Sequence, residues 1–410
     1  MRCNLWNWRC FKPALAVACI LELAIYPSTP AAAETIKIVS SLPRTGSAKQ
    51  QTDTIVNGIR MALEEAGHKA GGLTLEYNDL DDATAAAGQW VTEREAANAK
   101  LAVNDRDVVV YLGPYNSGAA KISMPILNKA GLLMISPSTS WPGLTKPDIG
   151  DRGEPEIYRP TGKINFFRVL PADDLQGPRG AEWAKELGVK RVYVLDDNEV
   201  YGKGIATMFA DACEDLDIEV IDQESIDAKA QEFKSLMIKI KGKKPDLVYF
   251  GGTTQSKGGQ IAKDMVAAGL NCKIMVPDAC YEEAFIKSAG AKNLNGRCYV
   301  TFGGLPPDAL TGPGKKFAEK YRKKFGGEPE AYAIYGYEAA KVAIAVIDKA
   351  QKKDREAILE ACRTLKNFDQ GALGKWSFDK NGDTSLTTIS GSLVKDGKFE
   401  FVKLLGQEEK

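Results

Sequence analysis

Serine, tyrosine and asparagine side chains gather in a loop that follows an apolar strand predicted over Val108–Gly113. The loop contains Tyr115 and Asn116, and Ser117 is predicted as the N-cap of the helix that comes next. The first backbone N–H groups of a helix are free and lie at the positive end of its dipole, so they attract a carboxylate. Ordinary capping without a ligand explains the same residues, and this loop alone does not separate the two interpretations.

A second loop of the same kind follows the predicted strand Leu132–Ser136. It contains the hydroxyls of Ser138 and Ser140, followed by Trp141. Hydroxyls both donate and accept hydrogen bonds, which suits a zwitterion or an amide, and the indole ring would close one side of a pocket. Two neighbouring loops of this kind favour ligand binding over simple capping.

Polar side chains also follow predicted strands in the second half of the chain. The carboxylate of Asp278 would either pair with a ligand ammonium or cap a helix ahead of Tyr281. Tyr201 offers a ring face or a hydroxyl, and Thr253 lies in a third loop. Ligands of open parallel sheets bind outside the carboxyl ends of the strands, so these loops form the predicted binding site.

Residue patterns for catalysis or metal binding are scarce. The glycine-rich run Gly251–Lys257 lacks the spacing of a phosphate-binding loop, and the single histidine, His68, lies where a cation complements a helix dipole. Asp379 begins a sequence similar to a calcium loop, but its twelfth residue is Ser390 rather than a glutamate. We therefore expect no catalytic residue, no metal and no cofactor.

The composition narrows the class of protein further. The 54 basic and 54 acidic side chains balance, which argues against a nucleic-acid binder. With 44% hydrophobic residues the chain can fold, and 410 residues suggest two domains.

The N-terminal segment 1–33 predicts a cleaved export signal. Basic residues precede a short apolar run at Ala14–Tyr26, and small residues follow it up to Ala33. Cleavage after Ala33 removes three of the 54 basic and one of the 54 acidic residues, so 51 and 53 remain, a net charge of −2. We expect a soluble, exported protein.

Five cysteines remain after this cleavage, none of them in a C-x-x-C pair, so no zinc or redox motif is predicted. A disulfide between Cys272 and Cys298 is one expectation, because both open consecutive predicted strands. Burial of all five as small hydrophobic residues is the other.

Apolar runs alternate with helical patterns along the rest of the chain, which predicts βαβ units and parallel sheets. The expected strands are 36–41, 73–78, 108–113, 132–136, 166–170, 191–196, 219–221, 246–251, 273–276 and 298–302. Three later helices, 314–325, 331–350 and 355–365, have no strands of their own, so we expect them to cover the first lobe. The tail predicts a hairpin around Asp396-Gly397.

These features together resemble the periplasmic branched-chain amino-acid binding proteins of ABC transporters, the leucine-, isoleucine- and valine-binding type. The motifs that carry the resemblance are 36–38, Pro43-x-Thr45-Gly46, 131–137, 201–204, 246–252 and 335–340. Each motif is weak alone, but their order extends from Ile36 to Leu405.

The resemblance implies an α/β, type I periplasmic-binding-protein fold, in which two doubly wound parallel-sheet lobes joined by three crossovers close on a ligand. The first lobe would comprise 34–168 and 304–378, and the second 169–303 and 379–410. The crossovers would lie near 169–173, 302–306 and 377–383.

The resemblance also assigns roles in the cleft. Ser117, Ser138 and Ser140 match first-lobe positions that hold the carboxylate and ammonium of an amino acid. In the second lobe Tyr201, Thr253 and Asp278 match binding positions, with Asp278 as the counter-ion of the ammonium. The side-chain pocket would be lined by residues matching Tyr115, Asn116 and Gln51.

The chain departs from the family pattern in ways that bear on the ligand. In the family, the position of Asp278 is often glutamate, and the positions of Thr253 and Gln51 are often tyrosine. The smaller groups at Thr253 and Asp278 would widen the pocket, so aromatic amino acids, amides and carboxylic acids stay open as ligands beside leucine, isoleucine and valine. The resemblance implies a monomer that delivers its ligand to an inner-membrane ABC permease. A ligand-sensing receptor module for amides or aromatic acids is the alternative, and an amidohydrolase is a third class without a recognisable nucleophile and base.

Overall fold

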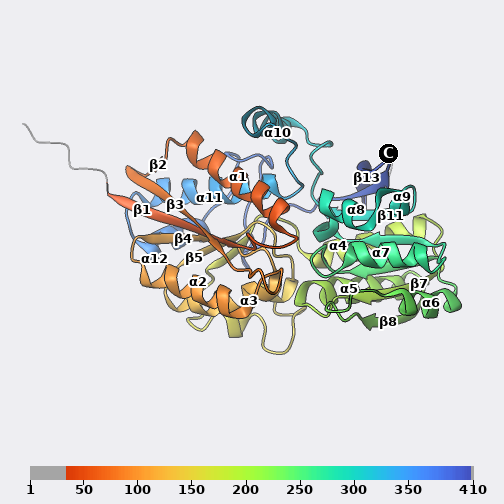
Figure 1. Cartoon of the computed structure of the whole chain (residues 1–410). Coiled ribbons are helices and arrows are strands. Elements are labelled where there is room, and N and C mark those ends of the chain that lie inside the picture. Colours follow the sequence, from red (N-terminus) through yellow and green to blue (C-terminus); the bar gives the residue numbers. More distant parts are fainter. Residues whose placement is uncertain (1–33, 408–410) are drawn as a thin grey trace, which may run out of the picture. The chain divides into compact units, whose positions relative to one another are not determined.

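The computed structural model describes residues 34–407, and the predicted export signal lies outside them (Figure 1). Two separate sheets organise this part of the chain. We call each sheet, together with the helices packed on it, a lobe. The α/β class and the doubly wound parallel architecture expected from the sequence are confirmed, whereas the exact lobe boundaries stay a prediction.

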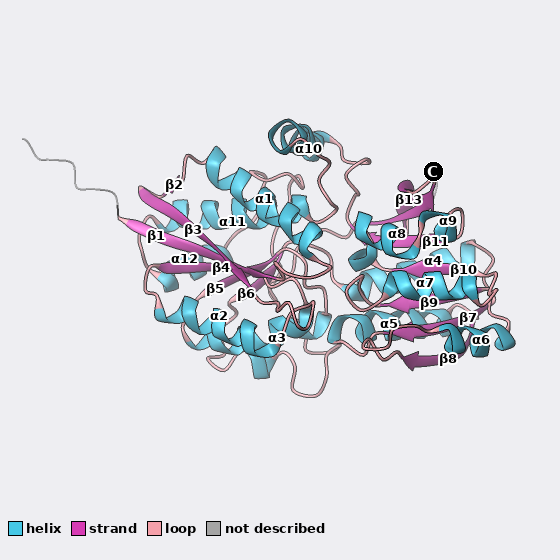
Figure 2. Cartoon of the chain, viewed as in Figure 1, coloured by secondary structure: helices cyan, strands magenta, loops and turns pink. Residues whose placement is uncertain are grey.

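The first lobe contains a six-stranded sheet in the order β2-β3-β1-β4-β5-β6 (Figure 2). Its strands are β1 (Thr35–Leu42), β2 (Lys69–Ala70), β3 (Leu73–Asp81), β4 (Val108–Leu112), β5 (Leu133–Ser136) and β6 (Phe166–Arg168). All pairs are parallel except that of β2, a two-residue strand that the sequence pattern was too short to show. Strand order reverses beside β1, which leaves a crevice at the carboxyl edge of the sheet.

The second lobe repeats this order in a seven-stranded sheet, β13-β12-β11-β10-β9-β7-β8. Its strands are β7 (Arg191–Asp196), β8 (Glu219–Ser225), β9 (Leu247–Gly251), β10 (Lys273–Val276), β11 (Cys298–Gly303), β12 (Ile389–Lys395) and β13 (Lys398–Leu405). The expected tail hairpin is confirmed as β12 and β13, and it extends the sheet antiparallel to β11. Asp396 and Gly397 both have positive φ at its turn, as a tight hairpin requires.

Helices cover both faces of each sheet. In the first lobe they are α1 (Lys49–Glu65), α2 (Thr92–Asn104), α3 (Ser117–Lys129), α10 (Gly312–Phe325), α11 (Ala333–Ala350) and α12 (Arg355–Arg363). In the second lobe they are α4 (Asp173–Glu186), α5 (Val200–Asp215), α6 (Lys234–Lys243), α7 (Gly258–Ala267), α8 (Glu283–Ala289) and α9 (Ala291–Leu294).

The late helix α11 packs directly against α1, as expected for helices without strands of their own. The backbones approach so closely that a Cβ added at Gly58 would lie 2.3 Å from the Ala333 carbonyl oxygen. A Cβ at Gly336 would lie 2.4 Å from the carbonyl oxygen of Ile55. Glycine is therefore required on both helices for this contact, which joins the first helix of the described chain to one of its last.

No disulfide links Cys272 and Cys298, so that expectation is wrong. Cys298 is paired in register with Ile274 on the neighbouring strand, and Cys272 precedes that strand. The two thiols are thus offset along parallel strands rather than opposed. Of the five cysteines in the described chain, four are buried and Cys272 is half-buried.

The chain passes between the sheets after β6, after β11 and again before β12, and the buried Arg168 ties two of these passages together. Its Nε donates to Asp383 Oδ1 at 2.7 Å. Its Nη1 donates to the carbonyl oxygens of Thr139 and Trp141 at 3.2 and 2.9 Å. Arg168 thereby fixes the first and third passages against the loop that contains Ser138 and Ser140.

We expect Arg168→Met to lower the free energy of unfolding by ~3–5 kcal/mol, because the buried Asp383 carboxylate loses its partner at 2.7 Å and keeps only Lys146 at 4.0 Å as a salt-bridge partner in the described chain. Urea unfolding of the purified protein measures this. Arg322→Met is the matched control, since Arg322 pairs with Glu328 at the surface and its loss should cost at most about 1 kcal/mol. Equal effects of the two substitutions would contradict the anchoring role.

Candidate functional site

A small cavity of about 10 Å³ lies between the carboxyl ends of the two sheets, lined by residues of both lobes. Its lining residues are Tyr115, Asn116, Ser117, Ser138, Tyr201, Thr253, Ala279 and Tyr332. Six of these eight were predicted from the sequence as ligand contacts. The structure therefore brings together loops from distant parts of the chain, although their binding roles stay predictions.

The first-lobe wall is built around the start of α3. This helix begins at Ser117 with Asn116 as its N-cap, so the prediction that Ser117 is the N-cap is wrong by one position. The Ser117 hydroxyl instead accepts the backbone N–H of Trp141 at 3.3 Å, because the two loops lie side by side. No side chain caps this helix end, which leaves its positive end open to an anion.

Ser138 and Ser140 lie on the neighbouring loop and differ in their partners. The Ser138 hydroxyl donates to the Tyr115 carbonyl oxygen at 3.2 Å, which joins the two loops. The Ser140 hydroxyl is buried without a partner at ordinary hydrogen-bond geometry, outside the lining of the cavity. Its carbonyl oxygen accepts the backbone N–H of Asp173 at 3.0 Å, so Ser140 lies directly against the start of α4.

Asp278 does not itself line the cavity, but its carboxylate accepts hydrogen bonds from two tyrosines that do, and 1% of its surface is exposed. It accepts hydrogen bonds from the hydroxyl of Tyr201, from the hydroxyl of Tyr332 at 2.5 Å and from the backbone N–H of Ala279 at 3.0 Å. Burial raises its pKa even though these donors act in the opposite direction. Asp278 opens a short 3-10 helix whose N-cap is Pro277, so the alternative role as a helix N-cap is wrong.

Asp173, the first residue of α4, is a site residue that the sequence analysis missed. It is fully buried, and neither carboxylate oxygen has a partner at ordinary hydrogen-bond geometry. Burial raises its pKa well above the usual range and the nearby charge of Asp278 raises it further, while the Ser140 hydroxyl acts in the opposite direction. The strand-end rule that identified Asp278 would have found Asp173 too, because it follows the apolar segment 166–170.

Tyr332 was also missed, and no local pattern could have shown it. It is the N-cap of α11, a helix of the first lobe, yet its hydroxyl reaches Asp278 in the second. Its ring meets the ring of Tyr115 edge-on, with 5.8 Å between centroids. Tyr332 thus joins the two lobes at the cavity wall.

Thr253 and Gln51 complete the predicted set. The Thr253 hydroxyl lies 3.0 Å from the hydroxyl of Ser256, which stabilises its loop. Gln51 does not line the cavity, but its Nε2 donates to the Tyr115 hydroxyl at 3.3 Å. Gln51 therefore lies immediately behind the ring of Tyr115.

Trp141 was expected to close one side of the pocket, but it does not line the cavity. Its ring packs against α5 of the second lobe so closely that a Cβ added at Gly204 would lie 2.4 Å from it. Its Nε1 donates to Glu154 Oε2 at 2.9 Å. Trp141 is therefore a contact between the lobes beside the cavity.

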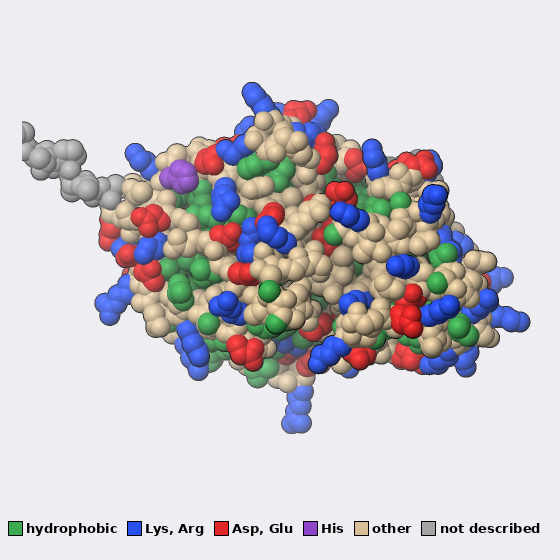
Figure 3. All heavy atoms as spheres, viewed as in Figure 1, with side chains coloured by type: hydrophobic (Ala, Val, Ile, Leu, Met, Phe, Trp, Pro, Cys, Tyr) green, Lys and Arg blue, Asp and Glu red, His purple; other side chains and the backbone are tan. Residues whose placement is uncertain are grey.

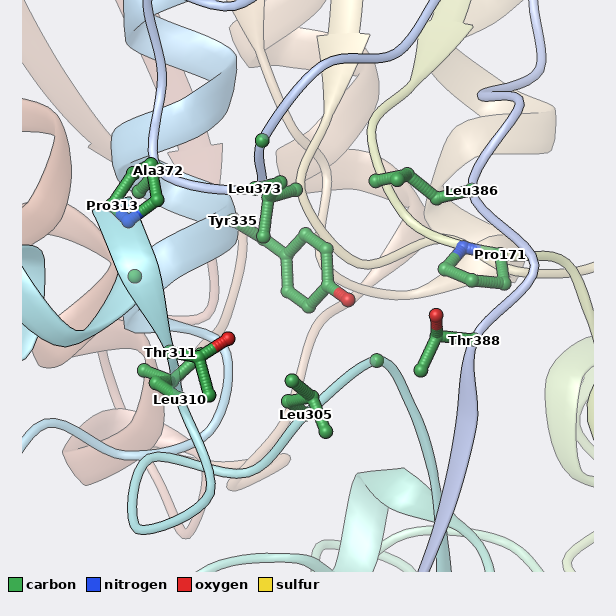
Figure 4. A pocket seen from close by; sticks show the side chains of 13 residues that line it. Pro171, Leu305, Leu310, Thr311, Pro313, Tyr335, Ala372, Leu373, Leu386 and Thr388 are labelled. Atoms are coloured by element: carbon green, nitrogen blue, oxygen red, sulfur yellow. The ribbon is translucent and has the colours of Figure 1, made fainter. Parts of the chain in front are cut away.

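A second, larger cavity of about 180 Å³ lies among the passages between the lobes (Figure 4). Figure 4 shows Leu305, Leu386, Pro171 and Tyr335 around it, and no charged side chain is among its lining residues. A zwitterion would lose its hydration there without gaining a charged partner. No charged side chain lines the smaller cavity either, but two of its lining tyrosines, Tyr201 and Tyr332, donate to the buried carboxylate of Asp278. The smaller cavity is therefore the better candidate for a charged ligand.

No charged side chain of either sign lines the smaller cavity, and the buried acids near it are Asp278 and Asp173. The charge of Arg168 lowers the pKa of Asp173, but the Arg168 guanidinium itself pairs with Asp383. On the outer face, by contrast, both signs of charge are interspersed (Figure 3).

Within residues 34–407 no group of three His, Cys, Asp or Glu side chains is arranged to hold a metal ion, and no helix is long and apolar enough to cross a membrane.

Comparisons with known proteins agree with this geometry. A family model described as periplasmic binding protein matches residues 35–389. Two curated relatives are each 30% identical: a Leu/Ile/Val-binding protein of Rhizobium johnstonii, with 89% of this chain and 93% of the relative covered, and a leucine-, isoleucine-, valine-, threonine- and alanine-binding protein of Pseudomonas aeruginosa, with 88% and 91% covered. The structure of the substrate-binding protein LivJ from Streptococcus pneumoniae with isoleucine matches with a TM-score of 0.78 and 25% identity, covering 91% of this chain and 99% of LivJ.

We expect Asp173→Asn to stabilise the ligand-free protein at pH 8. A carboxyl whose pKa is raised in the folded state contributes fully to stability below its unfolded pKa, and this contribution is lost as the pH rises through the folded pKa. At pH 8 the substitution should therefore add ~1–3 kcal/mol to the free energy of unfolding, and the gain should shrink toward pH 4.

Urea unfolding across this pH range measures the effect. Asp174→Asn is the control, because the Asp174 carboxylate pairs with Lys146 at 2.5 Å. Removing that charge should not increase the free energy of unfolding. A loss of stability in the Asp173 variant at pH 8 would show that the carboxylate has a partner in the free protein.

Proposed function

This chain belongs to the periplasmic binding protein family, and from that premise we propose that it captures an amino acid between its two lobes and delivers it to an ABC importer. The family resemblance drawn from the sequence is confirmed by the match over residues 35–389. The relatives named above are binding proteins for branched-chain and small amino acids. The function proposed for this chain follows from them and from its own cavity.

The observation that carries the proposal is the pair of buried carboxylates, Asp173 and Asp278, beside an uncapped helix end at Ser117. A zwitterion presents an ammonium and a carboxylate on adjacent atoms. The ammonium would neutralise the two acids, and the carboxylate would accept backbone N–H groups at the start of α3. An amino acid matches this distribution of charge.

A carboxylic acid that has no ammonium fits the cavity less well. It would add a negative charge to a space where Asp173 and Asp278 already repel each other. A neutral amide would leave the carboxylates without a cation. The acids therefore favour an amino acid over the amides and aromatic acids considered as alternatives.

Ligand binding and lobe closure are coupled in this proposal. Tyr332 of the first lobe donates to Asp278 of the second, so the site is complete only while the lobes are in contact. A ligand that contacts both lobes stabilises that arrangement, and the passages around Arg168 would act as the hinge. A micromolar Kd requires about −8 kcal/mol, which a few charge-assisted hydrogen bonds and side-chain burial supply.

The setting of the protein is part of the same proposal. We propose that residues 1–33 direct export to the periplasm and are removed after Ala33. The mature protein then acts as a soluble monomer that binds and releases its ligand without chemical turnover and docks on a membrane permease. These statements follow from the sequence pattern and the family.

We expect Asp278→Asn to weaken amino-acid binding by ~30- to 1000-fold, because a buried charge partner of the ammonium is lost. Isothermal titration with an amino acid that the wild type binds measures this. The 2-hydroxy acid of the same side chain has no ammonium, so its weaker binding should change by less than about 5-fold.

The control is Asp396→Asn, a substitution at the exposed hairpin turn that should leave both affinities unchanged. Equal losses for the amino acid and the hydroxy acid would rule out Asp278 as the ammonium partner.

A further inference from the structure

Three glutamates from both lobes meet next to the cavity, and we call them the acidic rim: Glu282, Glu283 and Glu330. Glu282 and Glu283 begin α8 of the second lobe, and Glu330 precedes α11 of the first. Gln50 Nε2 donates to Glu330 Oε1 at 2.8 Å and to Glu283 Oε2 at 3.1 Å. The backbone N–H of Glu283 lies 3.4 Å from Glu330 Oε1, so the rim is held together across the lobes.

The rim extends inward to the cavity through Glu282. This side chain is 1% exposed, and its Oε2 has no hydrogen-bond partner. It follows Asp278 closely in the chain, and Ala279 between them lines the cavity. Its charge also acts on the hydroxyl of Tyr115, another lining residue, so Glu282 lies against the cavity wall.

Gln51 presents a second buried acceptor to the same place from the first lobe. It is fully buried, its Nε2 is used by the Tyr115 hydroxyl, and its Oε1 has no partner. Asn116, which lines the cavity, has an unpartnered Oδ1 as well. Asn116 Oδ1 at the cavity wall, and Gln51 Oε1 and Glu282 Oε2 behind that wall, thus have no donor at ordinary hydrogen-bond geometry. Buried acceptors are costly to leave in that state.

An aliphatic side chain would leave all of these acceptors unsatisfied, whereas an N–H-bearing side chain would satisfy them. A cation favours the ionised form of a neighbouring carboxyl, which an amide does not, so the rim favours a cation over an amide. Burial raises the pKa of Glu282 to about 8 and that of Glu330 to about 7. The hydroxyl of Thr254 acts in the opposite direction on Glu282, and the charge of Glu330 adds to the effect of burial. The structure gives no salt bridge between the rim and a lysine or arginine anywhere in residues 34–407.

We propose that the ligand is an α-amino acid with a basic side chain, whose terminal ammonium or guanidinium lies between Glu282 and Gln51 beside Tyr115. This inference rests on the proposed function, because Asp173, Asp278 and the start of α3 hold the α-ammonium and α-carboxylate. It extends that function to the side chain. It also separates this chain from relatives named for leucine, isoleucine and valine.

Isothermal titration of the ligand-free protein with lysine, arginine, glutamine and leucine tests the proposal. We expect lysine or arginine to bind at least about 10-fold more tightly than leucine and glutamine, the lower limit for a hydrogen bond to a charged group. Leucine binding as tightly as both basic amino acids would overturn the basic-ligand inference and leave the proposed function intact. Binding of no amino acid at all would overturn the proposed function.

Glu282→Gln tests the residue assignment. The substitution should weaken binding of the basic amino acid by about 10- to 100-fold and change the affinity for leucine by less than about 3-fold. Glu232→Gln is the matched control, because Glu232 is an exposed glutamate of the second lobe outside the acidic rim, and its substitution should change the affinity for both ligands by less than about 3-fold. Equal losses for the basic amino acid and for leucine in the Glu282 variant would overturn the assignment. The comparison of wild-type affinities stands without any variant, so the proposal stays testable if a variant fails to fold.

Discussion

Negative charge buried at the contact between the two lobes is the constraint on which the rest of this structure depends. Asp173 and Asp278 lie close enough for their charges to interact, and no cation lines the cavity beside them. Asp278 is stabilised by Tyr201 from its own lobe and Tyr332 from the other, while the carboxylate of Asp173 has no partner at ordinary hydrogen-bond geometry. Ionised carboxylates in such surroundings lower the free energy of unfolding of the ligand-free protein. A cationic group of the ligand would offset this loss of stability.

This arrangement explains why the lobes need a defined hinge. The hydroxyl of Tyr332 reaches Asp278 only when the two sheets face each other at the correct angle. Arg168 fixes two of the three passages between the lobes through Asp383 and the loop that carries Ser138. An apolar cavity lies among the same passages, so side chains do not pack the hinge region completely. The hinge thus sets the geometry in which the acids meet.

Most of the fold could be predicted because a run of apolar residues indicates a buried strand. Every strand expected from such a run is present, and the tail hairpin follows from the turn at Asp396 and Gly397. Strand β2 was missed because so short a strand gives no periodicity. The disulfide failed for a different reason: the positions of Cys272 and Cys298 along the chain do not give the register of their strands.

The candidate site was predictable wherever its residues follow a strand. Tyr115, Ser117 and Ser138 line the cavity because the carboxyl ends of parallel strands share one edge. Asp173 obeys the same rule and was overlooked. Tyr332 obeys no local rule, since its place depends on a helix that returns to the first lobe after most of the second sheet has been laid down in the chain.

The sequence by itself determined the α/β class, the strand-end loops and the family, because these depend on local periodicity and on motifs in a fixed order. Only the tertiary structure decided which polar atoms are left without partners when the lobes meet. The burial of Asp173, the reach of Tyr332 and the unpartnered oxygens of Glu282 and Gln51, one from each lobe, are examples. Hydrogen bonding and desolvation depend on every neighbour in space, and the neighbours of these atoms come from segments that lie far apart in the chain.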